Sequence, residues 1–239
     1  MNALILAAGL GTRLRPLTDT MPKALVPVAG KPLLQHLIEK LKACGCCQIV
    51  VNVHHFAEQI MEFLTAHQNF GIDIQISDER RQLLDTGGAV KKALPLFCNA
   101  DPVLVHNVDV LNNISLDSFY QQNAHLGDAT LLVSHRATSR YLLADADHRL
   151  IGWKNVKTGE TKGQQDGMAY AFSGIHIFSP ALLPLMNEWG DCFSIIDFYL
   201  HACTTHRILL QPSSSLQMLD VGKIDSISIA ESFISRLHD

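Results

Sequence analysis

The feature that most constrains the fold is the alternation of short strands with amphipathic helices over the first half of the chain. The strands are apolar or alternating runs, and the helices carry apolar residues three and four positions apart. This order predicts βαβ units with right-handed crossovers. We therefore expect an α/β fold with a Rossmann-like, mostly parallel sheet flanked by helices. The expected strands cover Asn2–Ala7, Gln48–Val53, Ile72–Ser77 and Pro102–Asn107, and the expected helices cover Pro32–Cys44, Phe56–His67 and Gly88–Phe97.

The second half of the chain is richer in strands. A polar stretch, Gly159–Gly167, is expected to be a loop between the last two of them. The sequence shows no repeat, low-complexity tract or linker, so we expect a single domain over residues 1–239. The expected strands cover Ala129–His135, Tyr141–Asp145, Leu150–Lys154 and Met168–Ser179, and the expected helices cover Ser194–Thr204 and Lys223–Leu237.

Composition excludes several classes of partner. The chain has 47% hydrophobic and 18% charged residues, which is ordinary for a globular protein with a substantial core. Its net charge is −4 and it has no basic block, so we expect neither nucleic acid nor a membrane surface as a partner. No stretch approaches the roughly 18 apolar residues of a membrane span, and no signal-peptide pattern follows Met1. We expect a cytoplasmic location, and the sequence leaves the oligomeric state open.

Six cysteines are scattered along the chain, three of them within Cys44–Cys47. A zinc site would need a second pair of ligands at suitable spacing, and the three later cysteines do not form one. His54 and His55 follow soon after the first group, but they are more typical of an ordinary helix start. We expect reduced cysteines that pack between a helix and a strand.

The first strand leads into a glycine-rich loop, within the stretch LAAGLGTRLRPLTDTMPKALVPVAGKP that covers residues 6–32. Ligands of open α/β sheets bind at the carboxyl ends of the strands, where this loop lies. Its small residues allow backbone N–H groups to approach an anion, and Arg13 and Lys23 add two cations that suit phosphate oxygens. No Lys-Ser/Thr pair follows the glycines, and Leu14 stands where a dinucleotide fingerprint has its third glycine. The loop therefore predicts a phosphate site of another kind.

Two stretches, GLGTRLRPLT at residues 9–18 and PKALVPV at residues 22–28, resemble the signature GxGTRLxPLT…PKxLxPV of sugar-1-phosphate nucleotidylyltransferases. The resemblance covers essentially the whole chain and implies a glycosyltransferase-A-like nucleotidyltransferase core. The length of the chain and the residues of its motifs resemble those of the short members, such as N-acetylmuramate-1-phosphate uridylyltransferases and mannose-1-phosphate guanylyltransferase-like enzymes. No C-terminal β-helix is therefore expected. Five later segments resemble further motifs of the family, in the family's order: Leu84–Gly88 (LDTGG), Asn107–Asp109 (NVD), Gly152–Lys154 (GWK), Phe172–Ile175 (FSGI) and Leu219–Gly222 (LDVG).

The resemblance implies that an NTP and a sugar 1-phosphate give an NDP-sugar and pyrophosphate, in support of cell-wall or surface glycan synthesis or recycling. Residues 1–110 would be the nucleotide-binding part and residues 111–239 the sugar-phosphate-binding part. Mg²⁺ is the implied cofactor, with Asp109 and Asp220 as its ligands. The implied catalytic residues are Arg13, Lys23, Asp109 and Lys154. The implied nucleotide contacts are Ala8, Gly9, Gly11, Thr12, Arg13, Lys23, Asp85, Thr86, Gly87 and Gly88, and the sugar-phosphate contacts are Asn107, Lys154, Gly174 and Asp197.

Departures from the family pattern keep an alternative open. Val108 stands where the family has glycine, next to the nucleotide, and Trp153 replaces a glutamate. A regulatory subunit that binds nucleotide sugars without turnover would tolerate these changes, although the retained cations and carboxylates favour an enzyme. A Rossmann oxidoreductase lacks support, because no ribose-binding acid ends the second strand.

The sequence does not determine the base or the sugar. Asp78 and Glu79 lie just before the LDTGG motif, where a carboxylate would accept hydrogen bonds from guanine or cytosine. The same two residues would equally fit a solvated loop, in which their charges face water.

Overall fold

A computed structural model describes residues 1–238, and its core is a mixed sheet of ten strands. Four neighbouring parallel strands form one half of this sheet, in the spatial order β5-β4-β1-β6. Each agrees with an expected strand to within a residue at either end, so the alternation in the sequence predicted this half correctly. The strands are β1 (Asn2–Leu6), β4 (Gln48–Val53), β5 (Asp73–Asp78) and β6 (Val103–Asn107).

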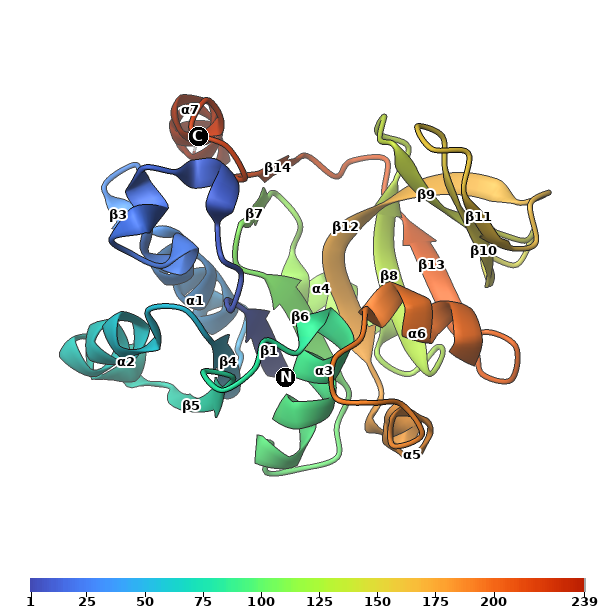
Figure 1. Ribbon diagram of the computed structural model, residues 1–239, viewed down its shortest axis with the longest axis horizontal. Coiled ribbons are helices and arrows are strands. Elements are labelled where there is room, and N and C mark those ends of the chain that lie inside the picture. Colours follow the sequence, from blue (N-terminus) through green and yellow to red (C-terminus); the bar gives the residue numbers. More distant parts are fainter. Residues whose placement is uncertain (239) are drawn as a thin grey trace.

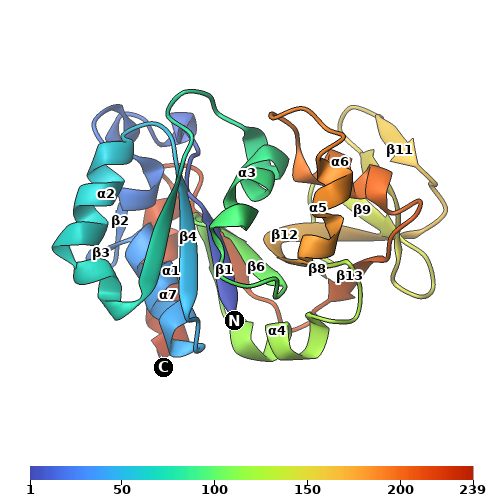
Figure 2. The same ribbon diagram turned by 90° about the horizontal axis from the view of Figure 1, so that it is seen from below.

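Helices cover both faces of the parallel strands, because successive side chains of a strand point to opposite sides. Ile5 belongs to one apolar cluster, with residues of α1, α2, α4 and α7, and Leu4 belongs to a second, with residues of α3, α5 and α6. Figure 2 shows α1, α2 and α7 on one side of β1 and β4, and α3 on the other. The helices are α1 (Leu33–Ala43), α2 (Ala57–Ala66), α3 (Asp85–Ala93), α4 (Leu116–Asn123), α5 (Leu183–Met186), α6 (Ile195–Ala202) and α7 (Ser226–His238).

The long strand β12 (Met168–Phe178) joins the two halves of the sheet. Its first residues pair with β9 and its last residues pair antiparallel with β6, so the sheet continues from one half of the chain into the other. Figure 1 shows β12 curving from the outer strands β9, β10 and β11 toward β6. The remaining strands of this half are β8 (Ala129–Ser134), β9 (Arg140–Ala144), β10 (Leu150–Asn155), β11 (Thr161–Gly163) and β13 (Ile208–Pro212).

The structure corrects the expected loop at Gly159–Gly167. Residues Thr161–Gly163 form β11, which pairs antiparallel with β10. All three residues are exposed, so backbone pairing forms this strand without any apolar pattern in the sequence. The two-residue strands β2 (Pro27–Val28) and β3 (Lys31–Pro32), and the strands β7 (Val110–Asn112) and β14 (Met218–Asp220), were also not expected; they are too short to show a period.

The end of the chain returns to its beginning. Val221 and three residues of α7, Ala230, Phe233 and Ile234, are buried in the same apolar cluster as α1. Residues after β13 therefore pack on the first part of the protein, although the division at residue 110 would assign them to the second.

Of the helices within residues 1–238, none has the length and apolar character that a bilayer crossing requires.

The cysteines of the Cys44–Cys47 group differ in burial. Cys46 is buried and its thiol donates to the Gln48 carbonyl at 3.3 Å, whereas Cys47 is exposed. Burial raises the pKa of Cys46 to about 12, so this thiol stays protonated.

Candidate active site

The loop after β1 turns sharply at Gly11 and brings Lys23 beside it. Gly11 has a φ of 62°, a left-handed backbone that glycine adopts without strain. A Cβ at this position would lie 2.9 Å from Thr18 Cγ2 and 3.0 Å from Lys23 Cβ, so a side chain would push these groups apart. Thr18 Oγ1 donates to the Gly11 carbonyl at 2.8 Å and holds the turn.

Asn52, near the end of β4, holds the first residues of this loop. Its Oδ1 accepts from the N–H of Ala7 at 2.6 Å and from that of Ala8 at 3.2 Å. Ala8 is a residue expected to contact a nucleotide, but its N–H group already donates to a side chain of the protein. Sequence reasoning missed Asn52, although an amide between the valines of the run IVVNV is the signal that would have found it.

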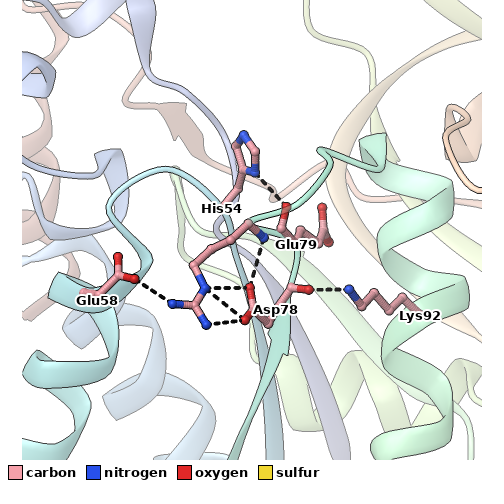
Figure 3. A network of polar contacts seen from close by, with 6 residues as sticks. His54, Glu58, Asp78, Glu79 and Lys92 are labelled. Carbon is pink, nitrogen blue, oxygen red and sulfur yellow. Dashed lines mark hydrogen bonds and ion pairs between the residues drawn. The ribbon is translucent and has the colours of Figure 1, made fainter.

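Glu79, directly after β5, continues this chain of buried polar contacts. Its Oε1 accepts from Asn52 Nδ2 at 2.8 Å, and its Oε2 accepts from the N–H of Leu84 at 3.2 Å. Figure 3 shows the ring of His54 against the Glu79 carbonyl, with Nδ1 at 2.8 Å from it. The side chain is 1% exposed, and burial raises the pKa of its carboxyl group. Glu79 therefore joins β4 to the turn that begins α3.

Asp78 belongs to an ion-pair network on the surface (Figure 3). Arg80 places Nη2 at 2.6 Å from Asp78 Oδ2 and Nη1 at 2.6 Å from Glu58 Oε1. Lys92 donates to the backbone carbonyl of Asp78. The hydrogen bonds from Arg80 lower the pKa of the Asp78 carboxyl to about 2. Of the two interpretations that the sequence left open, Asp78 fits the solvated loop, whereas Glu79 is buried and bonded.

The first turn of α3 packs against the segment that precedes α6. The N–H of Gly87 donates to the Phe193 carbonyl at 2.8 Å, and the N–H of Ile195 donates to Thr86 Oγ1 at 3.0 Å. A Cβ on Gly88 would lie 1.9 Å from the carbonyl oxygen of Asp191, and one on Gly87 would lie 2.4 Å from the Phe193 ring. These two glycines therefore allow the two segments to meet. Their direct contact with a nucleotide stays a prediction.

Two carboxylates that are far apart in the sequence meet at the carboxyl end of β6. Asp109 follows β6, and Asp220 ends β14, whose antiparallel pairing with β7 sets Asp220 opposite Val110. The N–H of Val221 donates to the Asp109 carbonyl at 2.8 Å and fixes this junction. Neither carboxylate caps a helix, a common structural role of aspartate.

Two cations from the loop after β1 lie at the carboxylates. Lys23 Nζ forms an ion pair with Asp109 in which both side chains are largely buried. Arg13 lies at Asp220, since a Cβ on Gly222 would be 2.9 Å from Arg13 Nη2 and 2.6 Å from Asp220 Oδ1. Part of the Asp220 side chain reaches solvent, and the groups around it desolvate the rest. This desolvation and the charge of Asp109 raise the pKa of Asp220, although the nearby cations act to lower it.

The two carboxylates alone do not complete a metal site, and Mg²⁺ binding by them stays a prediction. Hard cations such as Mg²⁺ prefer carboxylate, phosphate and water oxygens. Over residues 1–238, no group of three or more His, Cys, Asp and Glu side chains is placed to hold a metal. Asp109 and Asp220 therefore fit a cation that brings phosphate oxygens with it, and pairing with such a cation would relieve the repulsion between them.

The residues around this junction line a cleft of about 640 Å³. Val108 is 5% exposed and packs in the same apolar cluster as β1, while its N–H donates to the Leu6 carbonyl at 3.1 Å. The branched side chain is thus held mainly in the core. Expected site residues that line the cleft are Ala8, Gly9, Gly11, Thr12, Arg13, Lys23, Asp85, Thr86, Asn107 and Asp109, and the structure adds Asn52 and Glu79.

The expected sugar-side residues are only partly brought together. Gly174 has a φ of 80°, and a Cβ there would lie 2.7 Å from Asn107 Nδ2, so these two residues are in contact at the edge of the cleft. Lys154 lies on β10, outside the cleft lining. Asp197, on α6, pairs with Lys162 of β11 at 2.7 Å. The contacts of Lys154 and Asp197 with a sugar phosphate stay predictions.

Comparisons with known proteins agree with the expected family. The sequence profile described as Nucleotidyl transferase matches residues 2–236. The N-acetylmuramate alpha-1-phosphate uridylyltransferase of Neisseria meningitidis serogroup B is 33% identical over 237 residues, 97% of each chain. The protein of the same name from Caulobacter vibrioides is 51% identical over 109 residues, 45% of each chain. The crystal structure of HddC from Yersinia pseudotuberculosis, complexed with GMP-PN, matches this one with a TM-score of 0.77, over 98% of this chain and 99% of that one. The two sequences are 24% identical, and the structural match confirms the expected fold.

Proposed function

The chain belongs to the nucleotidyl transferase family, and from this premise we propose that it is a Mg²⁺-dependent uridylyltransferase that acts on a sugar 1-phosphate. The reaction would join UTP and the sugar 1-phosphate into a UDP-sugar and release pyrophosphate. One observation carries the proposal: β14 pairs with β7 and sets Asp220 beside Asp109, at the loop that holds Arg13 and Lys23. Membership of this family removes the oxidoreductase alternative.

The proposed reaction needs no side-chain nucleophile, because a phosphate oxygen of the sugar substrate attacks the α-phosphorus of UTP. The work of the protein is to position two anionic substrates and to neutralise their charge. Arg13 would bind the pyrophosphate that leaves, and Lys23 the phosphates near the reacting centre. Lys23 would exchange Asp109 for a phosphate oxygen, which the flexible lysine stem permits.

Asp109 and Asp220 are the proposed ligands of Mg²⁺. When bound, the ion supplies positive charge at phosphate oxygens during the transfer. Lys23 pairs with Asp109 and Arg13 lies near Asp220, so each carboxylate has a neighbouring cation before substrate arrives.

The bonding of Asp78 and Glu79 within the protein supports uracil over guanine as the base. Guanine presents N–H donors that suit a free carboxylate, but both oxygens of the buried Glu79 already accept bonds from Asn52 and Leu84. Asp78 is paired with Arg80 on the surface. Uracil has one ring N–H and two carbonyl oxygens, which backbone groups of a loop can match without a carboxylate.

The proposed sugar substrate is N-acetylmuramate 1-phosphate. The support is the similarity to two proteins named for that reaction, one of them matched over 97% of both chains. A UDP-linked product would serve cell-wall or surface glycan synthesis or recycling.

The test is a substrate panel read by pyrophosphate release. UTP, GTP, CTP and dTTP are each combined with the 1-phosphates of N-acetylmuramate, glucose and mannose, with Mg²⁺ and with EDTA. We expect the highest turnover for UTP with N-acetylmuramate 1-phosphate, and its loss in EDTA. Turnover limited to GTP and mannose 1-phosphate would replace the uridylyl assignment. Binding of UDP-sugars without turnover of any pair would support the regulatory alternative.

A further inference from the structure

The cations that line the cleft come from one side of it. Among the cleft-lining residues within the described part of the chain, these cations are Arg13 and Lys23, and both belong to the segment after β1. A sugar 1-phosphate brings about 1.5 to 2 negative charges. It would have to bind beside two carboxylates, Asp109 and Asp220. A cation from the second part of the chain would offset this repulsion.

Lys154 was the expected source of that charge. It lies on β10, in the outer antiparallel extension, where it pairs by register with Tyr141 of β9 and Thr161 of β11. Neither partner strand borders the cleft.

Arg136 is another cation from the second part of the chain. It follows β8, whose carboxyl end lies at the same end of the molecule as β14 and the loop after β1 (Figure 1). Its Nη2 donates to the Phe172 carbonyl at 2.9 Å. This bond anchors the guanidinium on β12, at the point where the pairing between β12 and β8 changes register.

The anchor of Arg136 is connected to the cleft wall. Phe172 lies two residues before Gly174, and Gly174 contacts the side chain of Asn107, which lines the cleft. Arg136 is therefore held on β12 two residues before the glycine that meets the cleft wall. The side chain is exposed, and the bond to Phe172 is the one hydrogen bond that it makes within residues 1–238, so most of its N–H donors face solvent.

We propose that Arg136 binds an anionic oxygen of the sugar substrate and completes the cation set of the cleft from the sugar side. This inference rests on the proposed function. The anionic oxygen belongs either to the 1-phosphate or to the carboxylate of an acidic sugar, since a guanidinium fork matches both groups.

The test uses two substrates that differ in one charged group. N-acetylmuramate 1-phosphate carries a carboxylate, and N-acetylglucosamine 1-phosphate has the same ring without it. Initial rates are measured for wild type, Arg136→Ala and Arg136→Lys, with each substrate varied separately. Arg140→Ala is the matched control, because Arg140 is an exposed arginine at the start of β9. Thermal unfolding of each variant reports whether the fold is kept.

We expect Arg136→Ala to raise KM for N-acetylmuramate 1-phosphate about 10- to 100-fold, the effect of losing a charged hydrogen bond. The KM of Arg136→Ala for UTP and its unfolding temperature should stay at wild-type values. The Arg140→Ala control should match wild type in every one of these measurements. Arg136→Lys should recover part of the loss, because it keeps the charge without the fork. These selective effects would not follow from a merely structural role of Arg136.

The two substrates identify the bound group. A rise in KM with both of them assigns Arg136 to the phosphate, and a rise with N-acetylmuramate 1-phosphate alone assigns it to the carboxylate. Unchanged KM for both in an active enzyme overturns the inference and leaves the proposed function standing. A wild type that turns over neither sugar phosphate, nor any other in the substrate panel, refutes the proposed function and this inference with it.

Discussion

The two sides of the cleft differ in how firmly their polar side chains are held. On the nucleotide side, Asn52 and Glu79 are 3% and 1% exposed, and their bonds connect the ends of β1, β4 and β5 to the start of α3. On the sugar side, Arg136 is exposed with one bond to the backbone, and Asp197 is 45% exposed. A buried and satisfied network holds its geometry before a ligand binds, whereas exposed side chains take up theirs on binding. The proposed nucleotide side is therefore preorganised, and the proposed sugar contacts Arg136 and Asp197 are adaptable.

The two kinds of strand arrangement in the sheet differ in the same way. Parallel strands covered on both faces end together, so their last polar side chains are buried against one another. The antiparallel strands β9, β10 and β11 extend from the sheet as hairpins, and β11 is exposed along its whole length. Polar residues on such strands meet solvent more often than each other.

The largest effect is expected on the preorganised side, at Lys23. Lys23→Ala removes a buried charge that pairs with Asp109 and would bind phosphate, and loss of one such group lowers kcat/KM by about 10²- to 10³-fold. The rate of pyrophosphate release gives the measurement. Lys31→Ala is the control, since Lys31 forms an exposed pair with Glu39 in the same segment and should keep the wild-type rate. A near-normal rate for Lys23→Ala would contradict the assignment of this loop.

Asn52→Ala compares the two sides directly. It leaves Glu79 and the N–H groups of Ala7 and Ala8 without their partner, so the free energy of unfolding should fall by about 2 to 4 kcal/mol. KM for UTP should rise, because the loop loses its anchor. Asn155, buried on β10, accepts from the N–H of Lys157 at 3.0 Å in the same manner, far from the nucleotide loop.

Asn155→Ala should therefore lower stability by about 1 to 2 kcal/mol and leave KM for UTP unchanged. Urea denaturation and steady-state kinetics measure both quantities. Equal effects of the two variants on KM for UTP would remove the distinction between the two sides.

His176, on β12, is buried without the bonds that satisfy Asn52 and Glu79. Neither ring nitrogen has a hydrogen-bond partner within residues 1–238, and burial lowers the pKa of His176 to about 3. Unfolded histidine has a pKa of about 6.5. Between these values the unfolded chain binds a proton that the folded protein does not, so stability should fall as the pH falls from about 6.5 toward 3.

His176→Leu should reduce this slope by up to about 1.4 kcal/mol per pH unit, measured by urea denaturation from pH 7 down to pH 4. His125→Gln, at an exposed position, is the control and should keep the slope of wild type. An unchanged slope in His176→Leu would mean that a proton or a water molecule reaches this ring in the folded protein.

The smallest effect is expected at the ion pair between Asp197 and Lys162. Both side chains are more than two-fifths exposed, at 45% and 43%, so Asp197→Asn should change the free energy of unfolding by less than about 1 kcal/mol. KM for the sugar 1-phosphate reports separately on a substrate contact. A large loss of stability would show that the sugar side is more firmly held than its exposure indicates.

Prediction from the sequence succeeded where the signal is local. β4 and β6 are runs of buried residues, and their period, length and order along the chain give the parallel half of the fold. The same method missed β11, which has no apolar side, and the three-residue strands β7 and β14. Short strands have no measurable period, and they form because another segment offers a backbone edge.

The site divides in the same way. The sequence by itself placed Arg13 and Lys23 on a glycine-rich loop at a strand end, because the glycines and both cations belong to one continuous segment. The family resemblance implied that Asp109 and Asp220 share a cation, but only the tertiary structure showed that the pairing of β14 with β7 sets them side by side, and that Glu79 is a bonded support instead of a free acceptor. It also set Arg136 against the Phe172 carbonyl on β12. Each of these positions depends on a partner far away in the chain, and a pattern of neighbouring residues carries no information about such distances.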